Sequence, residues 1–141
     1  MSIFNAKLFG ANVGIAGDWH ADFKWALSAL DLFAHKGITT IIHLGDFGIL
    51  PAARGAKYIE LISQRLVKNN QTLYIVLGNH EDYSQTNVVP HGSDGTQNFA
   101  TNLYLLPRNF RWSWKARSLV ALGGANSINY SSLVPPSLMV A

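Results

Sequence analysis

Residues 38–46 decide the fold, and they read Ile-Thr-Thr-Ile-Ile-His-Leu-Gly-Asp. The first seven are mostly β-branched or apolar without alternation, which is typical of a strand buried on both faces. Two other runs share this character, Val-Gly-Ile-Ala at 13–16 and Thr-Leu-Tyr-Ile-Val-Leu at 72–77. Each run is followed by glycine and then by Asp or Asn. The chain is therefore expected to contain three buried strands that end in similar turns.

Helical patterns occupy the segments between these strands. From about Asp22 to Lys36, apolar residues recur every three or four positions, and Gly37 follows where a helix C-cap glycine belongs. The second pattern runs from about Pro51, which suits a first helical turn, to about Val67. Strands that alternate with helices predict two βαβ units, hence a parallel sheet with right-handed crossovers.

The second half of the chain has a different pattern. Residues 81–98 are polar and rich in Asn, Ser and Gly, which predicts a loop. An apolar run at 103–106 is stopped by Pro107, and aromatic residues then alternate with polar ones over 110–115, as in a half-buried strand. Residues 118–122 are expected to return as its hairpin partner. The predicted fold class is α/β, a parallel βαβαβ sheet followed by a β-hairpin.

The composition limits the function classes. With 141 residues, 48% hydrophobic and 13% charged, the chain can form one globular domain. It has no cysteine, which excludes disulfides and thiolate chemistry. The net charge of +3 comes from Lys and Arg residues scattered along the chain, so a nucleic-acid partner is not expected. No stretch looks like a signal peptide or a membrane span, and a cytoplasmic protein is expected.

Polar residues with metal-binding side chains follow each predicted strand. The three segments are Gly17-Asp18-Trp19-His20, Gly45-Asp46 and Gly78-Asn79-His80. Sites in open parallel sheets form beyond the carboxyl ends of the strands, where neighbouring loops converge. Carboxylate, amide and imidazole ligands suit Mn, Fe, Zn or similar ions, and two such ions can activate water for attack on a phosphoester. Any single Asp or Asn here could be an ordinary turn residue, but the set favours a metal site.

These segments resemble the motifs of the calcineurin-like metallophosphoesterase family, Asp-X-His, Gly-Asp and Gly-Asn-His-Asp/Glu, in the same order. The resemblance implies the four-layer α/β/β/α fold of that family and a pair of divalent metal ions. It implies that Asp18 and His20 bind the first ion, Asp46 bridges, Asn79 binds the second, and His80 contacts the phosphate or protonates the leaving oxygen. Substrates in the family are phosphorylated small molecules, nucleotides or phosphoproteins.

Two further family motifs are not found. Members supply another His and a Gly-His-X-His segment after the Gly-Gly-Ala loop, whereas this sequence has five histidines and none after Asn126. The interpretation is an incomplete phosphoesterase domain over residues 1–130, the N-terminal part of the fold, with an irregular tail at 131–141. One ion is expected to be retained, the second is in doubt, and the uncovered sheet could associate with a partner. The alternative is a catalytically inactive remnant that binds metal, a phosphate ligand or a protein.

The sequence also predicts roles for several residues outside the candidate ligand set. Trp19 is expected to pack beneath the metal loop, with a place lining the mouth of the site as the alternative. His43 is expected to be a hydrogen-bonded core residue. Asp22 and Glu81 are candidate acceptors for the N–H groups of the ligand imidazoles. His91, in the polar loop, is a remote candidate for a missing metal ligand.

Overall fold

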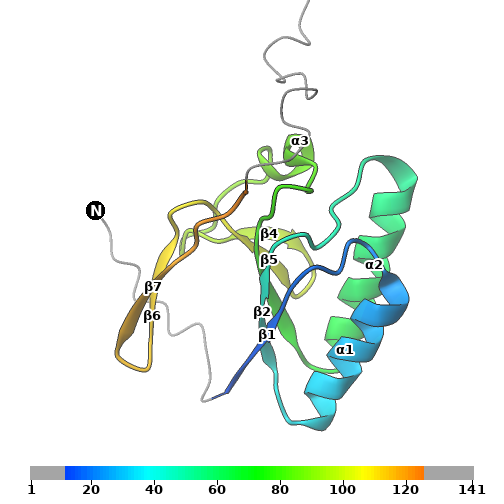
Figure 1. Cartoon of the computed structure of the whole chain (residues 1–141), viewed down its shortest axis with the longest axis horizontal. Coiled ribbons are helices and arrows are strands. Elements are labelled where there is room, and N and C mark those ends of the chain that lie inside the picture. Colours follow the sequence, from blue (N-terminus) through cyan, green and yellow to red (C-terminus); the bar gives the residue numbers. More distant parts are fainter. Residues whose placement is uncertain (1–11, 126–141) are drawn as a thin grey trace, which may run out of the picture.

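The computed structural model describes residues 12–125, which form a five-stranded sheet with helices on one face and a hairpin on the other (Figure 1). The strand order is β1-β2-β3-β5-β4. β1, β2, β3 and β5 run parallel, and β4 is antiparallel to β5 at the edge. The strands are β1 (Val13–Ala16), β2 (Thr40–Leu44), β3 (Thr72–Val76), β4 (Gln97–Ala100) and β5 (Leu103–Leu106). The predicted parallel βαβαβ arrangement is confirmed.

Helices α1 (Phe23–His35) and α2 (Ala52–Lys68) cover one face of the sheet (Figure 1). Both lie within two residues of the predicted bounds. Their buried stripes include Leu30 of α1 and Ile62 of α2, which pack in one cluster with Ile41 and Ile75 of the central strands. Since side chains alternate along a strand, the residues next to Ile41 and Ile75 face the other side of the sheet.

The opposite face is covered by the hairpin of β6 (Arg111–Trp114) and β7 (Arg117–Val120), as predicted. Ile42 and Tyr74 of the sheet cluster there with Phe110 and Trp112. The described residues thus form three layers: helices, main sheet and hairpin. The hairpin leaves part of this sheet face uncovered, as the 59% exposure of Leu44 beside the hairpin indicates. The association expected through this surface stays a prediction.

Residues 81–98 are more ordered than the predicted loop. They contain the short helix α3 (Tyr83–Thr86) and the start of β4, and Gln97 is buried although it is polar. The Gln97 amide donates to the carbonyls of Thr86 and Val89 at 3.2 and 2.7 Å. Residues 97–100 form β4 because they pair with β5, although their sequence has no strand pattern.

The predicted boundary at residue 130 and the tail at 131–141 lie outside the described residues. Within residues 12–125, no helix combines the length and the apolar character needed to cross a membrane.

Candidate metal centre

The loops after β1, β2 and β3 converge at one edge of the sheet. Backbone bonds fasten the first loop to the second, since the amides of Asp18 and His20 donate to the carbonyls of Gly45 and Asp46 at 3.0 and 2.8 Å. A third bond, from Ala21 N–H to the Phe47 carbonyl at 3.1 Å, extends the pairing. The two loops are thus held in register without the use of any predicted ligand side chain.

Three predicted ligands form a compact group at this edge. Single ligand atoms of Asp18, His20 and Asp46 all lie within 4.8 Å of one another. His20 Nε2 is 3.6 Å from Asp18 Oδ1 and 3.9 Å from Asp46 Oδ2. Both distances are longer than the donor–acceptor distance of a good hydrogen bond. They match the roughly 3–4 Å between ligands that each lie about 2.0–2.2 Å from one ion. The donor set and its spacing therefore fit a divalent metal.

The backbone at the three ligands is in an unusual conformation. Asp18, His20 and Asp46 have φ angles of 55°, 46° and 54°, in the left-handed region that few residues other than glycine occupy. Such conformations persist where surrounding structure enforces them, and they cluster at functional sites. Here the bonds between the first two loops supply that enforcement.

The Asp46 carboxylate is the least exposed of the three candidate ligands. Its side chain is only 16% exposed, against 53% for His20 and 79% for Asp18. Its Oδ1 accepts a hydrogen bond of 3.3 Å from the backbone amide of His80, in the third loop. One carboxylate oxygen thus contacts the third loop while the other faces His20.

Asn79 and His80 lie at the same edge. Asn79 lines a cavity of about 200 Å³ together with Asp18 and Asp46. The His80 ring is exposed and lies with its centroid 5.7 Å from that of His20. Together with the group of three, the structure brings all five predicted site residues to one edge of the sheet; their roles as ligands and catalyst stay predictions.

Comparison with known families agrees with this arrangement. The calcineurin-like phosphoesterase family matches residues 11–135. The chain belongs to this family. No curated protein matches the sequence. The α/β fold is consistent with the metallophosphoesterase fold, and the Asp18, His20 and Asp46 group supports a metal-dependent phosphoesterase at the level of the family.

Glu81 has a different role from the one predicted. It is buried, and its carboxylate accepts hydrogen bonds from the amides of Gly48 and Gly78, at 3.1 and 2.5 Å. It therefore joins the second loop to the third instead of orienting an imidazole. The expectation for Asp22 was likewise wrong, because its side chain caps α1 by accepting from Trp25 N–H at 3.0 Å.

An aromatic cluster packs beneath the first two loops. Trp19 is 2% exposed, which confirms the packing role, and its ring centroid lies 4.7 Å from that of His43. Phe47 completes the cluster, 5.3 Å from His43. The prediction that His43 is hydrogen-bonded was wrong, since neither ring nitrogen has a partner among residues 12–125. Burial lowers the pKa of His43 from 6.5 to about 4 and keeps the ring neutral.

Two residues beyond the third motif complete the surroundings. His91 does not join the group of candidate ligands in the described part of the chain and instead lines a separate cavity, where Arg108 also lies. Arg108 received no role in the sequence analysis. Arg108 follows β5, a fourth parallel strand. Sites form beyond the carboxyl ends of parallel strands, so Arg108 could have been a candidate by the same rule. The position of Arg108 could not be predicted, because nothing in residues 103–106 indicates that this strand joins the main sheet.

Proposed function

We propose that the chain is a metal-dependent phosphoester hydrolase in which Asp18, His20 and Asp46 hold a divalent ion. One observation carries this proposal. The His20 imidazole lies between two carboxylates at 3.6 and 3.9 Å, separations that fit a shared ion better than direct hydrogen bonds. Mn²⁺ suits this mixture of oxygen and nitrogen ligands.

Each residue of the site has a distinct proposed role. When bound, the metal would supply a Lewis acid and a water activated for attack on phosphorus. Asp46 would bridge to a second ion held by Asn79, which lines the same cavity. The exposed His80 ring is free to approach a phosphate oxygen or to protonate the leaving oxygen, a role that suits histidine because its charge changes near neutral pH.

Other parts of the proposal concern substrate and location. We propose a phosphorylated small molecule, a nucleotide or a phosphoprotein as substrate, with the cytoplasm as the place of action. The scattered Lys and Arg residues argue against a nucleic acid.

The second candidate function is an inactive protein that binds metal, phosphate or a partner. It is favoured by the ligand count, because the described residues group three ligands for one ion and offer Asp46 and Asn79 for the other.

Hydrolysis of p-nitrophenyl phosphate and bis-p-nitrophenyl phosphate with Mn²⁺ separates the two. The chain is compared with Asp46→Asn and with a matched control, Glu60→Gln, which changes an exposed carboxylate on α2. Turnover that needs Mn²⁺, disappears in Asp46→Asn and survives in Glu60→Gln supports the hydrolase. A folded protein that binds Mn²⁺ without turnover supports the second candidate instead.

A further inference from the structure

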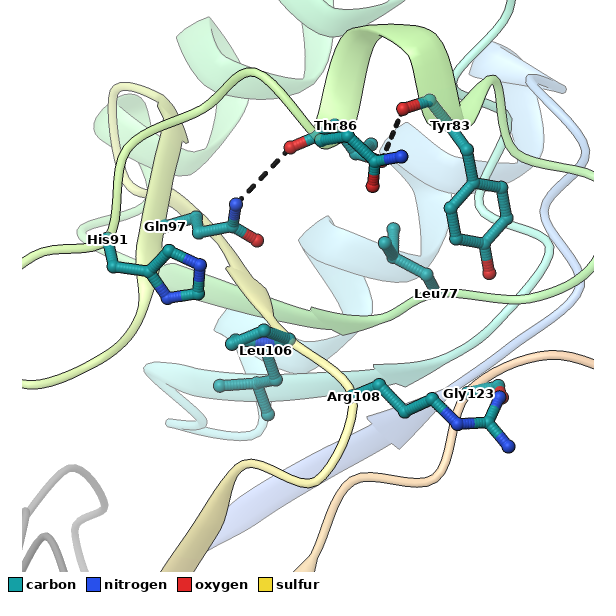
Figure 2. Close-up of a pocket in the computed structure, with 10 residues that line it drawn as sticks. Leu77, Tyr83, Thr86, His91, Gln97, Leu106, Arg108 and Gly123 are labelled. Carbon is teal, nitrogen blue, oxygen red and sulfur yellow. Dashed lines mark hydrogen bonds between the residues drawn. The ribbon is translucent and has the colours of Figure 1, made fainter. Parts of the chain in front are cut away.

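A second cavity adjoins the candidate metal centre. Its volume is about 270 Å³, and its lining residues come from the end of β3, from α3, from β4 and from the segment after β5 (Figure 2). Leu77 and Gly123 line both this cavity and the one that contains Asp18, Asp46 and Asn79. The two cavities therefore lie next to each other.

Arg108 stands at the boundary between the two cavities. Its Nη1 donates to the Gly123 carbonyl at 2.6 Å, and the close-up shows the two residues next to each other (Figure 2). The Gly123 loop is itself fixed, because the Gly124 amide donates to the Leu77 carbonyl at 2.9 Å. A guanidinium group has five N–H donors, so the Gly123 bond leaves most of them for another acceptor.

The charge around Arg108 is not neutralised locally. Among residues 12–125, no carboxylate lies within ion-pair distance of this guanidinium, and no Asp or Glu lines the cavity. His91 lines the same cavity from the β4 side. A planar cation without a carboxylate partner suits a carboxylate or phosphate, which a guanidinium can bind with two parallel hydrogen bonds.

The remaining walls mix apolar side chains with polar ones, which are Thr86, Asn87 and Gln97. The Tyr83 hydroxyl donates to the Gly78 carbonyl at 2.8 Å, which fixes its ring above the cavity, and Leu106 and Pro107 form the opposite side. The volume lies below the roughly 300–1,000 Å³ of pockets that enclose a whole ligand. The cavity is therefore the right size for one part of a substrate whose other part lies at the metal centre.

We propose that this cavity, with Arg108 as its anchor, binds a second anionic group on the leaving-group side of the substrate. The proposal rests on the proposed function, because it places the scissile phosphate at the metal centre. It narrows the substrate class to phosphoesters that carry a further carboxylate or phosphate. Arg108 is then a specificity-determining residue.

The test compares substrates that differ by one carboxylate. Phenyl phosphate and its 3- and 4-carboxy derivatives are assayed with Mn²⁺ on the unaltered chain, on Arg108→Gln and on Arg111→Gln. Arg108→Gln keeps a polar amide but removes the positive charge, and Arg111 is an exposed arginine outside the cavity lining. At least one carboxy derivative is expected to have the higher kcat/KM, and Arg108→Gln should lower that preference about tenfold. Arg111→Gln should keep it.

A binding measurement separates failure of this inference from failure of the proposed function. Calorimetric titration of 4-carboxyphenyl phosphate in EDTA needs no turnover, and Arg108→Gln should raise its Kd about tenfold relative to Arg111→Gln. If no substrate is hydrolysed but this difference appears, the anion site stands and the hydrolase proposal falls. If both variants bind and select alike, the cavity does not recognise an anion and the inference is overturned.

Discussion

Gly78 has no room for a side chain, because a Cβ at this position would overlap the carboxylate and the backbone amide of Asp46. The third loop thus lies directly against Asp46, the least exposed of the three candidate ligands. Asp46 and Gly78 belong to the second and third motifs and are 32 positions apart in the sequence. The glycine is needed for this close approach rather than for its φ angle.

The first prediction concerns this contact. Gly78→Ala should displace Asp46 and lower metal-dependent hydrolysis of p-nitrophenyl phosphate by about tenfold or more, since a misplacement of ~1 Å can cost about a hundredfold. Gly17→Ala is the matched control. It changes a glycine of the first motif, where a Cβ would meet only Leu44 Cβ at 3.9 Å. Equal activity of the two variants would contradict the idea that close packing positions Asp46.

The second prediction concerns the two bonds accepted by Glu81. Glu81→Gln keeps the shape but leaves one carboxamide oxygen to serve the amides of Gly48 and Gly78. The free energy of unfolding should fall by about 1–3 kcal/mol, and Mn²⁺ affinity should weaken because the second and third loops lose their connection. Urea unfolding and Mn²⁺ titration measure the two effects. Glu60→Gln, which affects only exposed contacts with Lys57 and Gln64, should change stability by about 1 kcal/mol or less.

Much of this arrangement was predictable from sequence because it is locally encoded. Each of the first three parallel strands is a continuous apolar run, and each ligand segment follows its strand after a glycine. Parallel pairing then brings the carboxyl ends of the strands to one edge without further information. For this reason Asp18, His20 and Asp46 could be grouped from their positions alone.

The errors concern features that depend on distant partners. Glu81 contacts backbone amides, and no residue type reveals that an amide 33 positions away needs an acceptor. β5 joins the sheet beside β3 and thereby brings Arg108 to the site edge, but its four-residue apolar run fits a hairpin or a core segment equally well. His43 was expected to have a polar partner, whereas aromatic rings surround it. Tertiary packing decided each of these cases.

The third prediction concerns stability in acid. Burial lowers the pKa of His43 from 6.5 to about 4, so between these values the unfolded chain binds a proton that the folded chain does not. The contribution to stability is therefore complete above about pH 6.5 and is lost as the pH falls toward 4. A shift of this size corresponds to roughly 3 kcal/mol. Urea unfolding at a series of pH values should show it.

The variant His43→Leu isolates this effect. It removes the titrating group and two buried nitrogens that have no partner among residues 12–125, so stability at pH 7 should stay equal or rise. Its unfolding free energy should fall less steeply than that of the unaltered chain between pH 6.5 and 4. Parallel curves for the two proteins would show that His43 does not stay neutral in the folded state.

The last prediction concerns metal-dependent stability. An ion that binds the folded chain alone stabilises it by about 2.7 kcal/mol at a concentration one hundred times its Kd. Mn²⁺ should therefore raise Tm by several degrees, and EDTA should reverse the increase. Asp18→Asn removes a ligand that is 79% exposed and makes no core contact, so it should abolish the increase while leaving the metal-free Tm nearly unchanged. A Mn²⁺-dependent increase that persists in Asp18→Asn and vanishes only in Asp46→Asn would assign the bound ion to Asp46 and Asn79 instead.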